Sequence, residues 1–138
     1  MKIEESLEEV EEIVRRLKAM NESVPIVVEG EKDVDALRSL GMEGKILTLH
    51  SGKGIVDFCD MIASEYSEIV VLTDWDRKGG KLSNALEQNL GGRTHCIMEF
   101  REMLARNTMV RNIESIPAYI KHVKIRIERG NRQHGQKI

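Results

Sequence analysis

Between residues 25 and 100 the chain alternates short apolar runs with longer segments whose apolar residues recur every three to four positions. The short runs are typical of buried strands, and the longer spacing is typical of amphipathic helices. Such an alternation predicts an α/β fold with a mostly parallel four-stranded sheet flanked by helices. Right-handed crossovers then place all strand carboxyl ends at one edge of the sheet. The predicted strands are residues 25–29, 45–49, 68–73 and 93–98, and the helices between them are residues 33–40, 55–63 and 81–90.

An amphipathic helix is predicted before this alternation, in residues 1–23. Its apolar residues follow steps of four and three and form one stripe, which packs against the sheet or against the partner chain of a homodimer. Ser6 followed by Glu9 fits a capping box, and Asn21 is a plausible helix stop. The stripe consists of Ile3, Leu7, Val10, Val14 and Leu17.

The last part of the chain differs from the rest in charge. Residues 101–138 carry nine Lys and Arg against three Asp and Glu, whereas residues 23–100 carry eight against thirteen. An acidic body with a basic extension suggests a cation site beside a polyanion-binding surface, although a solvated basic helix has the same composition. Residues 101–128 are predicted to be a basic helical extension, with residues 119–127 open to helix or strand. The polar residues 129–138 are predicted to be a disordered tail.

The composition is that of one cytoplasmic domain, residues 24–100, with an addition at each end. Of the 138 residues, 41% are hydrophobic and 32% charged, and no apolar stretch approaches the roughly 20 residues of a membrane span. The acidic, amphipathic start also lacks the features of a signal peptide. Cys59 and Cys96 form neither a CxxC motif nor a Cys/His cluster, so we expect small buried side chains rather than a zinc site or a disulfide.

Acidic side chains follow two of the predicted strands where each strand ends. Glu29 follows the run that ends at Val28, and Asp74 and Asp76 flank Trp75 after the third strand. The carboxyl ends of parallel strands lie side by side, and ligands bind there. Residues two apart in an extended segment point the same way, so both aspartates can face one Mg²⁺ together with Glu29. The alternative is that these aspartates serve an Asx turn or a helix N-cap.

Basic and glycine residues accompany these acids, as binding of a phosphate requires. A residue without a side chain lets the backbone approach a ligand, and Gly79 with Gly80 is interpreted as such an opening at a helix start. The glycine loop at residues 51–54 lacks the pattern of a P-loop, so an ordinary turn explains it equally well. Asp33 is predicted to cap the next helix, and His50 is a weaker candidate for contact with phosphate or metal. The candidate phosphate- or nucleic-acid-binding residues are Gly30, Lys32, Lys53, Arg77, Lys78 and Lys81.

Together the two acidic motifs resemble the Toprim family. Val-Val-Glu-Gly-Glu-Lys-Asp at residues 27–33 and Leu-Thr-Asp-Trp-Asp-Arg-Lys-Gly-Gly at residues 72–80 match its strand-end glutamate and its later DxD motif. The resemblance covers residues 24–100 and implies a Rossmann-like sheet. It is nearest to small stand-alone archaeal and bacterial Toprim proteins. Among the branches of the family, the resemblance is nearest to the nucleases that mature ribosomal RNA, because their first motif likewise runs glutamate, glycine, then lysine and aspartate.

The resemblance also implies roles for the acidic residues. Glu29 becomes the general acid/base and a metal ligand, and Asp74 and Asp76 become ligands of one or two Mg²⁺ ions, with Mn²⁺ as a substitute. Topoisomerase members often carry a further acid where this chain has Lys78. No tyrosine context for strand cleavage and no zinc-ribbon cysteines are present, so topoisomerase and primase activities are not expected of this chain.

Three functional hypotheses follow from these residues. The first is Mg²⁺-dependent cleavage of nucleic-acid phosphodiesters, RNA in preference to DNA, with basic residues from Arg101 onward extending the binding surface. The alternative is that the same site binds Mg²⁺ and docks nucleic acid or a protein partner without chemistry. The third is a phosphoacceptor or phosphatase with a strand-end aspartate, but the strand-end lysine of such folds is not evident in the sequence.

Overall fold

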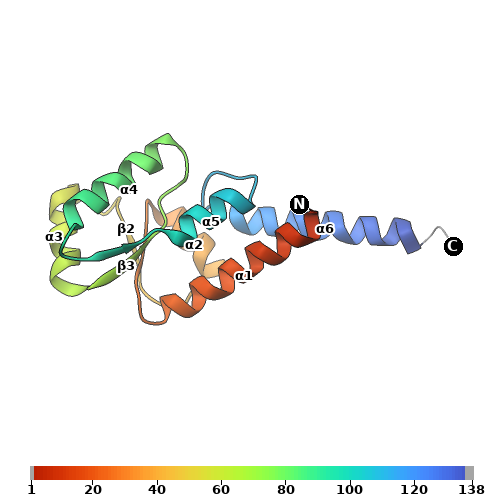
Figure 1. Ribbon diagram of the computed structural model, residues 1–138, viewed down its shortest axis with the longest axis horizontal. Coiled ribbons are helices and arrows are strands. Elements are labelled where there is room, and N and C mark those ends of the chain that lie inside the picture. Colours follow the sequence, from red (N-terminus) through yellow and green to blue (C-terminus); the bar gives the residue numbers. More distant parts are fainter. Residues whose placement is uncertain (1, 136–138) are drawn as a thin grey trace.

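A parallel sheet of four strands in the order β2–β1–β3–β4 forms the centre of the computed structural model, which describes residues 2–135 (Figure 1). Val27 lies opposite Leu47 on one side and opposite Val71 on the other, and every pairing is parallel. The predicted α/β fold is therefore confirmed. The strands are β1 (Ile26–Val28), β2 (Ile46–Thr48), β3 (Glu68–Val71) and β4 (His95–Ile97). The helices are α1 (Ile3–Asn21), α2 (Glu31–Ser39), α3 (Ile55–Glu65), α4 (Arg77–Leu90), α5 (Glu99–Asn107) and α6 (Ile116–Gly135).

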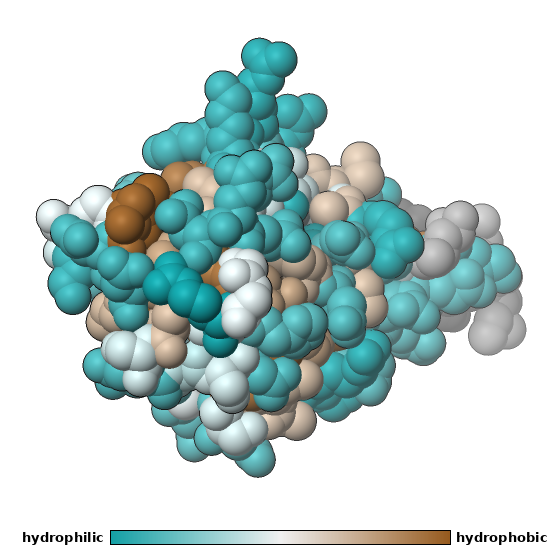
Figure 2. Space-filling model, turned by 60° about the vertical axis from the view of Figure 1, so that its left-hand side comes forward, coloured by the Kyte–Doolittle hydropathy of each residue, from teal (hydrophilic) through white to brown (hydrophobic). Residues whose placement is uncertain are grey.

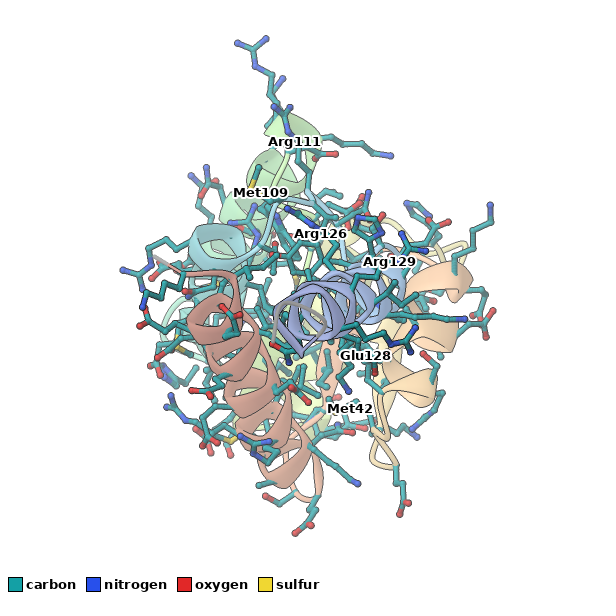
Figure 3. All side chains as sticks on the ribbon, turned by 90° about the vertical axis from the view of Figure 1, so that its right-hand side faces the viewer. Met42, Met109, Arg111, Arg126, Glu128 and Arg129 are labelled. Carbon is teal, nitrogen blue, oxygen red and sulfur yellow. The ribbon has the colours of Figure 1, made fainter. Side chains whose placement is uncertain are left out.

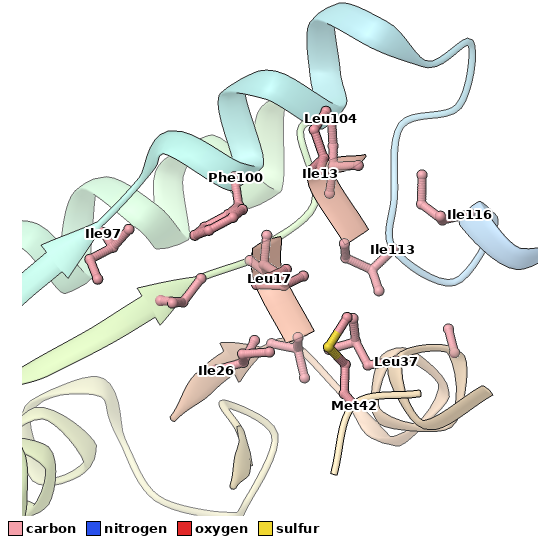
Figure 4. Close-up of a cluster of buried hydrophobic side chains, with 14 of the residues drawn as sticks. Ile13, Leu17, Ile26, Leu37, Met42, Ile97, Phe100, Leu104, Ile113 and Ile116 are labelled. Atoms are coloured by element: carbon pink, nitrogen blue, oxygen red, sulfur yellow. The ribbon is translucent and has the colours of Figure 1, made fainter. Parts of the chain in front are cut away.

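Side chains alternate between the two faces of the sheet and build two hydrophobic layers. Ile26 and Val28 of β1 join a cluster with α1, α2, α5 and the start of α6, whereas Val27 packs with α3 and α4 on the other face. Figure 4 shows the first cluster, where α1, α5 and the segment leading into α6 converge on the strands. A fully buried aliphatic or aromatic side chain contributes about 1.5–3 kcal/mol, so these two layers hold the helices on the sheet.

The strand order creates a crevice between β1 and β3. The helix that follows β1, α2, packs on one face through Ala36 and Leu37, and the helix that follows β3, α4, packs on the other through Leu86 and Leu90. After β1 the chain therefore crosses to one face of the sheet, and after β3 it crosses to the other face. Such a switch point at the carboxyl edge is where open α/β sheets bind ligands.

Helix α1 ends where the sequence predicts but begins earlier. Its last residue is Asn21, whose buried side chain bonds to the backbone of Val24 just before β1 and to that of Gly44 and Lys45 just before β2. The predicted capping box at Ser6 is wrong, because α1 already begins at Ile3. The Ser6 hydroxyl instead donates to the carbonyl of Asn107 at 3.0 Å and so ties α1 to the end of α5.

The chain after α5 is not the continuous helix that the sequence predicts. Residues 108–115 form an irregular segment, anchored by the buried side chain of Ile113, before α6 begins at Ile116. Pro117 lies in the first turn of α6. A proline is tolerated in that position because the N–H that it lacks would have no partner within the helix.

Helix α6 extends further than predicted and projects beyond the sheet (Figure 1). It includes residues 119–127, which the sequence left open between helix and strand, and it continues to Gly135. The predicted disorder is therefore wrong for residues 129–135, while residues 136–138 lie outside the described part of the chain. Gly130 costs only about 1 kcal/mol relative to alanine in a helix, and its polar neighbours are adequate helix formers.

The surface and the cysteines agree with the composition. The side of the molecule shown in Figure 2 is mostly hydrophilic, with small separate hydrophobic spots. Within residues 2–135, no helix combines the length and the apolar character needed to cross a membrane. Cys59 is buried and Cys96 half-buried, both as free thiols, and burial raises the pKa of Cys96 to about 11. Burial raises the pKa of both thiols, so both are weakly reactive.

Candidate metal and phosphate site

Glu29 and Asp74 meet at the carboxyl edge of the sheet. Glu29 directly follows β1 and is only 6% exposed, and its Oε2 accepts the N–H of Asp74 at 2.8 Å. Asp33 lies beside them, and its Oδ2 accepts the N–H of Gly30 at 3.1 Å. Asp33 thus caps α2 as predicted, although from within the first turn, because α2 already begins at Glu31. Neighbouring parallel strands therefore bring together carboxylates that are 45 positions apart in sequence.

The Asp74 carboxylate lies in an environment that opposes its negative charge. Burial and the charges of Glu29 and Asp33 raise the pKa of Asp74 to about 7, which the amide of Ile113 only partly offsets. Its Oδ1 atom is buried and has no hydrogen-bond partner. Burial also raises the pKa of Asp33. A buried oxygen without a partner costs about 1–3 kcal/mol, so this position favours either a proton or a cation.

Asp76 does not join this pair. It is the N-cap of α4, and its Oδ1 accepts the N–H of Gly79 at 2.8 Å. Its side chain is exposed, whereas Asp74 faces the interior next to Glu29. The cap that the sequence offered as an alternative is therefore what the structure shows for Asp76. Its role as a metal ligand remains a prediction from the family resemblance.

The predicted phosphate-binding residues separate into three groups. Gly30, Lys32 and Lys78 line an open hollow of about 360 Å³ together with Glu29, Asp33, Asp74, His50 and Glu114. Lys53 lines a neighbouring hollow along β2. Arg77 and Lys81 are exposed on the first turns of α4, outside both hollows. The structure thus places Lys32 and Lys78 beside the acidic pair and leaves the other cations around its rim.

Gly79 is required for a reason that the sequence did not indicate. A Cβ on this residue would lie 1.7 Å from the carbonyl oxygen of Asp74. The interpretation of Gly79 as an opening for phosphate is therefore wrong, because the space is taken by the backbone of residues 73–76, here called the acidic loop. The buried Thr73 hydroxyl reinforces this contact by donating to the Gly79 carbonyl at 2.8 Å.

Two further side chains hold the acidic loop in place, one outside the acidic motifs and one between the two aspartates. Arg101, in α5, donates to the carbonyl of Thr73 at 3.0 Å and to that of Asp74 at 2.8 Å. The indole N–H of Trp75 donates to the Val110 carbonyl at 2.6 Å. Sequence reasoning assigned Arg101 to a nucleic-acid surface, whereas its guanidinium is engaged with the backbone. Only its place just after the fourth strand could have indicated this role.

Replacing Arg101 by methionine is expected to destabilise the fold by about 1.5–3 kcal/mol, because two charge-assisted hydrogen bonds are lost. The matched control is Arg106→Met, since Arg106 is exposed on the same helix. Urea unfolding followed by circular dichroism measures both free energies. Equal stability of the two variants would show that Arg101 does not hold the acidic loop.

The donor set of the site suits a hard divalent cation. Carboxylate oxygens are the preferred ligands of Mg²⁺, which often uses only one or two of them and completes its shell with water and substrate phosphate. Glu29 and Asp74 supply two carboxylates, and the partnerless Oδ1 of Asp74 is an available ligand atom. Among the residues that the structure describes, no group of three or more His, Cys, Asp and Glu side chains is arranged to hold a metal. The protein alone therefore provides a partial coordination shell.

Comparison with known proteins agrees with this geometry. The family model of the Toprim domain matches residues 24–106, which include Glu29, Asp74 and Asp76. The chain belongs to the Toprim family. Toprim domains typically bind divalent metals, so membership links this protein to a metal-dependent function related to nucleic acids.

Two relatives and one solved structure are similar to this chain over most of its length. UPF0292 protein TV1259 of Thermoplasma volcanium is 33% identical over 77% of this chain and 90% of its own length. UPF0292 protein MJ1624 of Methanocaldococcus jannaschii is 28% identical over 87% of this chain and 96% of its own. A solved structure of an Aquifex aeolicus protein superposes with a TM-score of 0.68 at 26% identity and covers 76% of this chain and 95% of that one. Each of the three matches this chain over at least 90% of its own length.

Proposed function

We propose that this protein cleaves phosphodiester bonds of nucleic acids in a reaction that depends on Mg²⁺, with Mn²⁺ as a substitute. The observation that carries the proposal is the contact between Glu29 and Asp74 at the switch point, with a buried Asp74 oxygen that lacks a partner. When bound, a divalent cation supplies positive charge to the phosphate and lowers the pKa of a water ligand. The carboxylates of Glu29 and Asp74 would hold that cation.

The remaining side chains of the hollow have separate tasks in this proposal. Lys32 and Lys78 line it and would orient the phosphate through charge-assisted hydrogen bonds. Glu29, as the family resemblance implies, would exchange a proton with the attacking or leaving oxygen. Gly30 keeps the hollow open, since a Cβ there would come within 3.3 Å of His50 Nδ1.

RNA is proposed as the substrate in preference to DNA. The support is the order of residues in the first motif, which is that of the Toprim nucleases that mature ribosomal RNA. Lys78 stands where topoisomerase members often have an acid; this difference favours the binding module described below as the second candidate.

The test is incubation of purified protein with labelled structured RNAs and DNAs in Mg²⁺, in Mn²⁺ and in EDTA. Cleavage is expected with either metal and not with EDTA. Glu29→Gln, purified in the same way, is expected to lower the rate about 100-fold or more, as loss of a general acid/base does. Glu43→Gln, an exposed residue next to the turn that leads into β2, is the matched control. Equal cleavage by Glu29→Gln and wild type would assign the activity to a contaminant and contradict the proposal.

A second candidate is a binding module that uses the same site without chemistry. The observation that favours it is the use of Asp76 as a helix cap, which leaves Glu29 and Asp74 as the paired acids among the described residues. Nucleic-acid binding that weakens with salt, without cleavage in Mg²⁺ or Mn²⁺, would support this candidate over the nuclease.

A further inference from the structure

Helix α6 is rich in cations outside the stripe that packs on the body. Ile116 and Val123 are buried, and Tyr119 and Ile120 pack against the same cluster, so one stripe of the helix is committed to the core. The helix contains five Lys and Arg against one Glu. Of its cations, Lys124 lies 3.6 Å from Glu11 of α1. The exposed Arg126, Arg129 and Arg132 follow at steps of three along the projecting part.

These arginines carry charge that the described body does not neutralise. In the part of the chain that the structure describes, neither Arg126 nor Arg129 lies within ion-pairing distance of a carboxylate. Figure 3, which looks along α6 from its carboxyl end, places Arg126 on the same side as Met109 and Arg111, while Glu128 lies on another side.

Residues 108–115 connect this basic side of α6 to the acidic site. The Arg111 carbonyl accepts the N–H of Trp75 at 3.0 Å, so Arg111 lies directly beside the acidic loop. Its side chain is exposed, and that of Met109 is 88% exposed. Glu114 lines the same hollow as Glu29 and Asp74. The segment is anchored by the buried Ile113, so its exposed side chains are presented from a fixed backbone.

We infer that Arg111 and the arginines of α6 form a nucleic-acid-binding arm that leads away from the Glu29–Asp74 site. The inference rests on the proposed function for the class of partner. An α-helix of 20 residues is about 30 Å long, so the arm extends the contact surface well beyond a single scissile phosphate. Arginine binds phosphate oxygens through its planar fork, and each neutralised phosphate releases a counterion and makes affinity depend on salt.

The arm is tested by affinity, separately from cleavage. Fluorescence anisotropy with single-stranded and double-stranded RNA and DNA is measured in EDTA, which prevents metal-dependent cleavage, over a range of salt concentrations. Arg126→Ala/Arg129→Ala is expected to weaken binding about tenfold and to reduce the slope of log affinity against log salt by about two. Arg111→Ala is expected to reduce the slope by about one.

The matched control is Lys18→Ala/Lys45→Ala, which removes the same charge. Both lysines are exposed where α1 ends and where β2 begins, at the edge of the sheet opposite to the site. Circular dichroism verifies that each variant is folded. An equal loss of affinity in the control would reduce the effect to net charge and overturn the inference. Unchanged affinity of the α6 variant would also overturn the inference. The same holds if sedimentation shows that the variant changes only in its oligomeric state.

The two proposals fail in different ways. If RNA or DNA is bound through the arm but never cleaved, the inference stands and the nuclease proposal fails. If cleavage occurs and the α6 variant binds as wild type does, the nuclease proposal stands and the arm is wrong.

Discussion

Replacing Asp74 by asparagine is expected to abolish metal-dependent cleavage and, at neutral pH, to stabilise the metal-free protein. The activity is lost because the variant has one carboxylate fewer for the cation. The stability rises because asparagine does not place a second negative charge beside Glu29, whose Oε2 accepts the Asp74 N–H at 2.8 Å. Loss of activity together with a gain in stability is the trade-off expected where a functional site holds two acidic groups close together.

The pH dependence of stability follows from the same carboxyl group. The pKa of Asp74 is raised from 3.8 to about 7 in the folded protein. Because the folded state binds this proton more tightly than the unfolded state, the stabilisation is complete below about pH 4 and is lost as the pH rises through 7. The loss is about 2–4 kcal/mol, allowing for partial solvent exposure.

Urea unfolding in EDTA at pH 4 to 8 measures this dependence for the wild type and for Asp74→Asn. The difference in free energy of unfolding between them is expected to grow over that interval. Added Mg²⁺ or Mn²⁺ is expected to restore wild-type stability above pH 7 and to leave Asp74→Asn unchanged, because cation binding replaces the proton. Asp35→Asn, an exposed change on α2, is the matched control. Parallel pH curves for wild type and Asp74→Asn would refute the raised pKa.

Asp76→Asn separates capping from metal binding. Asparagine is as good an N-cap as aspartate, so the hydrogen bond to Gly79 is retained in this variant. A smaller loss of cation affinity than in Asp74→Asn is expected if Asp76 serves mainly as the cap. An equal loss would support the ligand role that the family resemblance implies.

Replacing Gly79 by alanine is expected to destabilise the protein by about 3 kcal/mol or more, because the new Cβ would overlap the backbone of the acidic loop. The separation from the Asp74 carbonyl oxygen would be 1.7 Å, so either α4 or the loop must move. Either movement would displace Asp74 from Glu29, and cation affinity is expected to fall together with stability.

Gly80→Ala is the matched control, one position along the same helix. Its nearest neighbour would be an Arg101 nitrogen at 3.9 Å, an ordinary contact. Alanine is a better helix former than glycine, so this variant is expected to gain up to about 1 kcal/mol. The free energies of unfolding of both variants are measured in urea. Similar values for the two would contradict the close approach of α4 to the loop.

The contacts that sequence reasoning found are those set by strand order and strand ends. Apolar runs such as Ile26–Val28 identified the strands, and parallel pairing then required Glu29 and Asp74 to lie close together. This part could be predicted because the hydrophobic pattern determines which strands are buried, and the handedness of crossovers determines which ends meet.

Sequence reasoning missed the contacts that later segments of the chain make where they fold back onto the site. Arg101 and Glu114 reach the site from the chain after β4, and no local pattern indicates that arrangement. Asp76 could be read as a ligand or a cap from its sequence context, and the position of Gly79 decides for the cap in this structure. The length of α6 was underestimated because its polar end has no apolar stripe, although a helix that starts on the core can extend into solvent.

The hydrogen bonds of Trp75 have a consequence for how this protein varies among its relatives. The indole and the amide of Trp75 both donate to carbonyls of residues 110 and 111, which lie outside the matched Toprim segment of residues 24–106. The acidic motif is therefore held partly by residues that lie outside the matched family segment. A relative with a different segment after α5 must hold its DxD loop by other bonds, so tryptophan between the aspartates and the course of residues 108–115 are expected to change together.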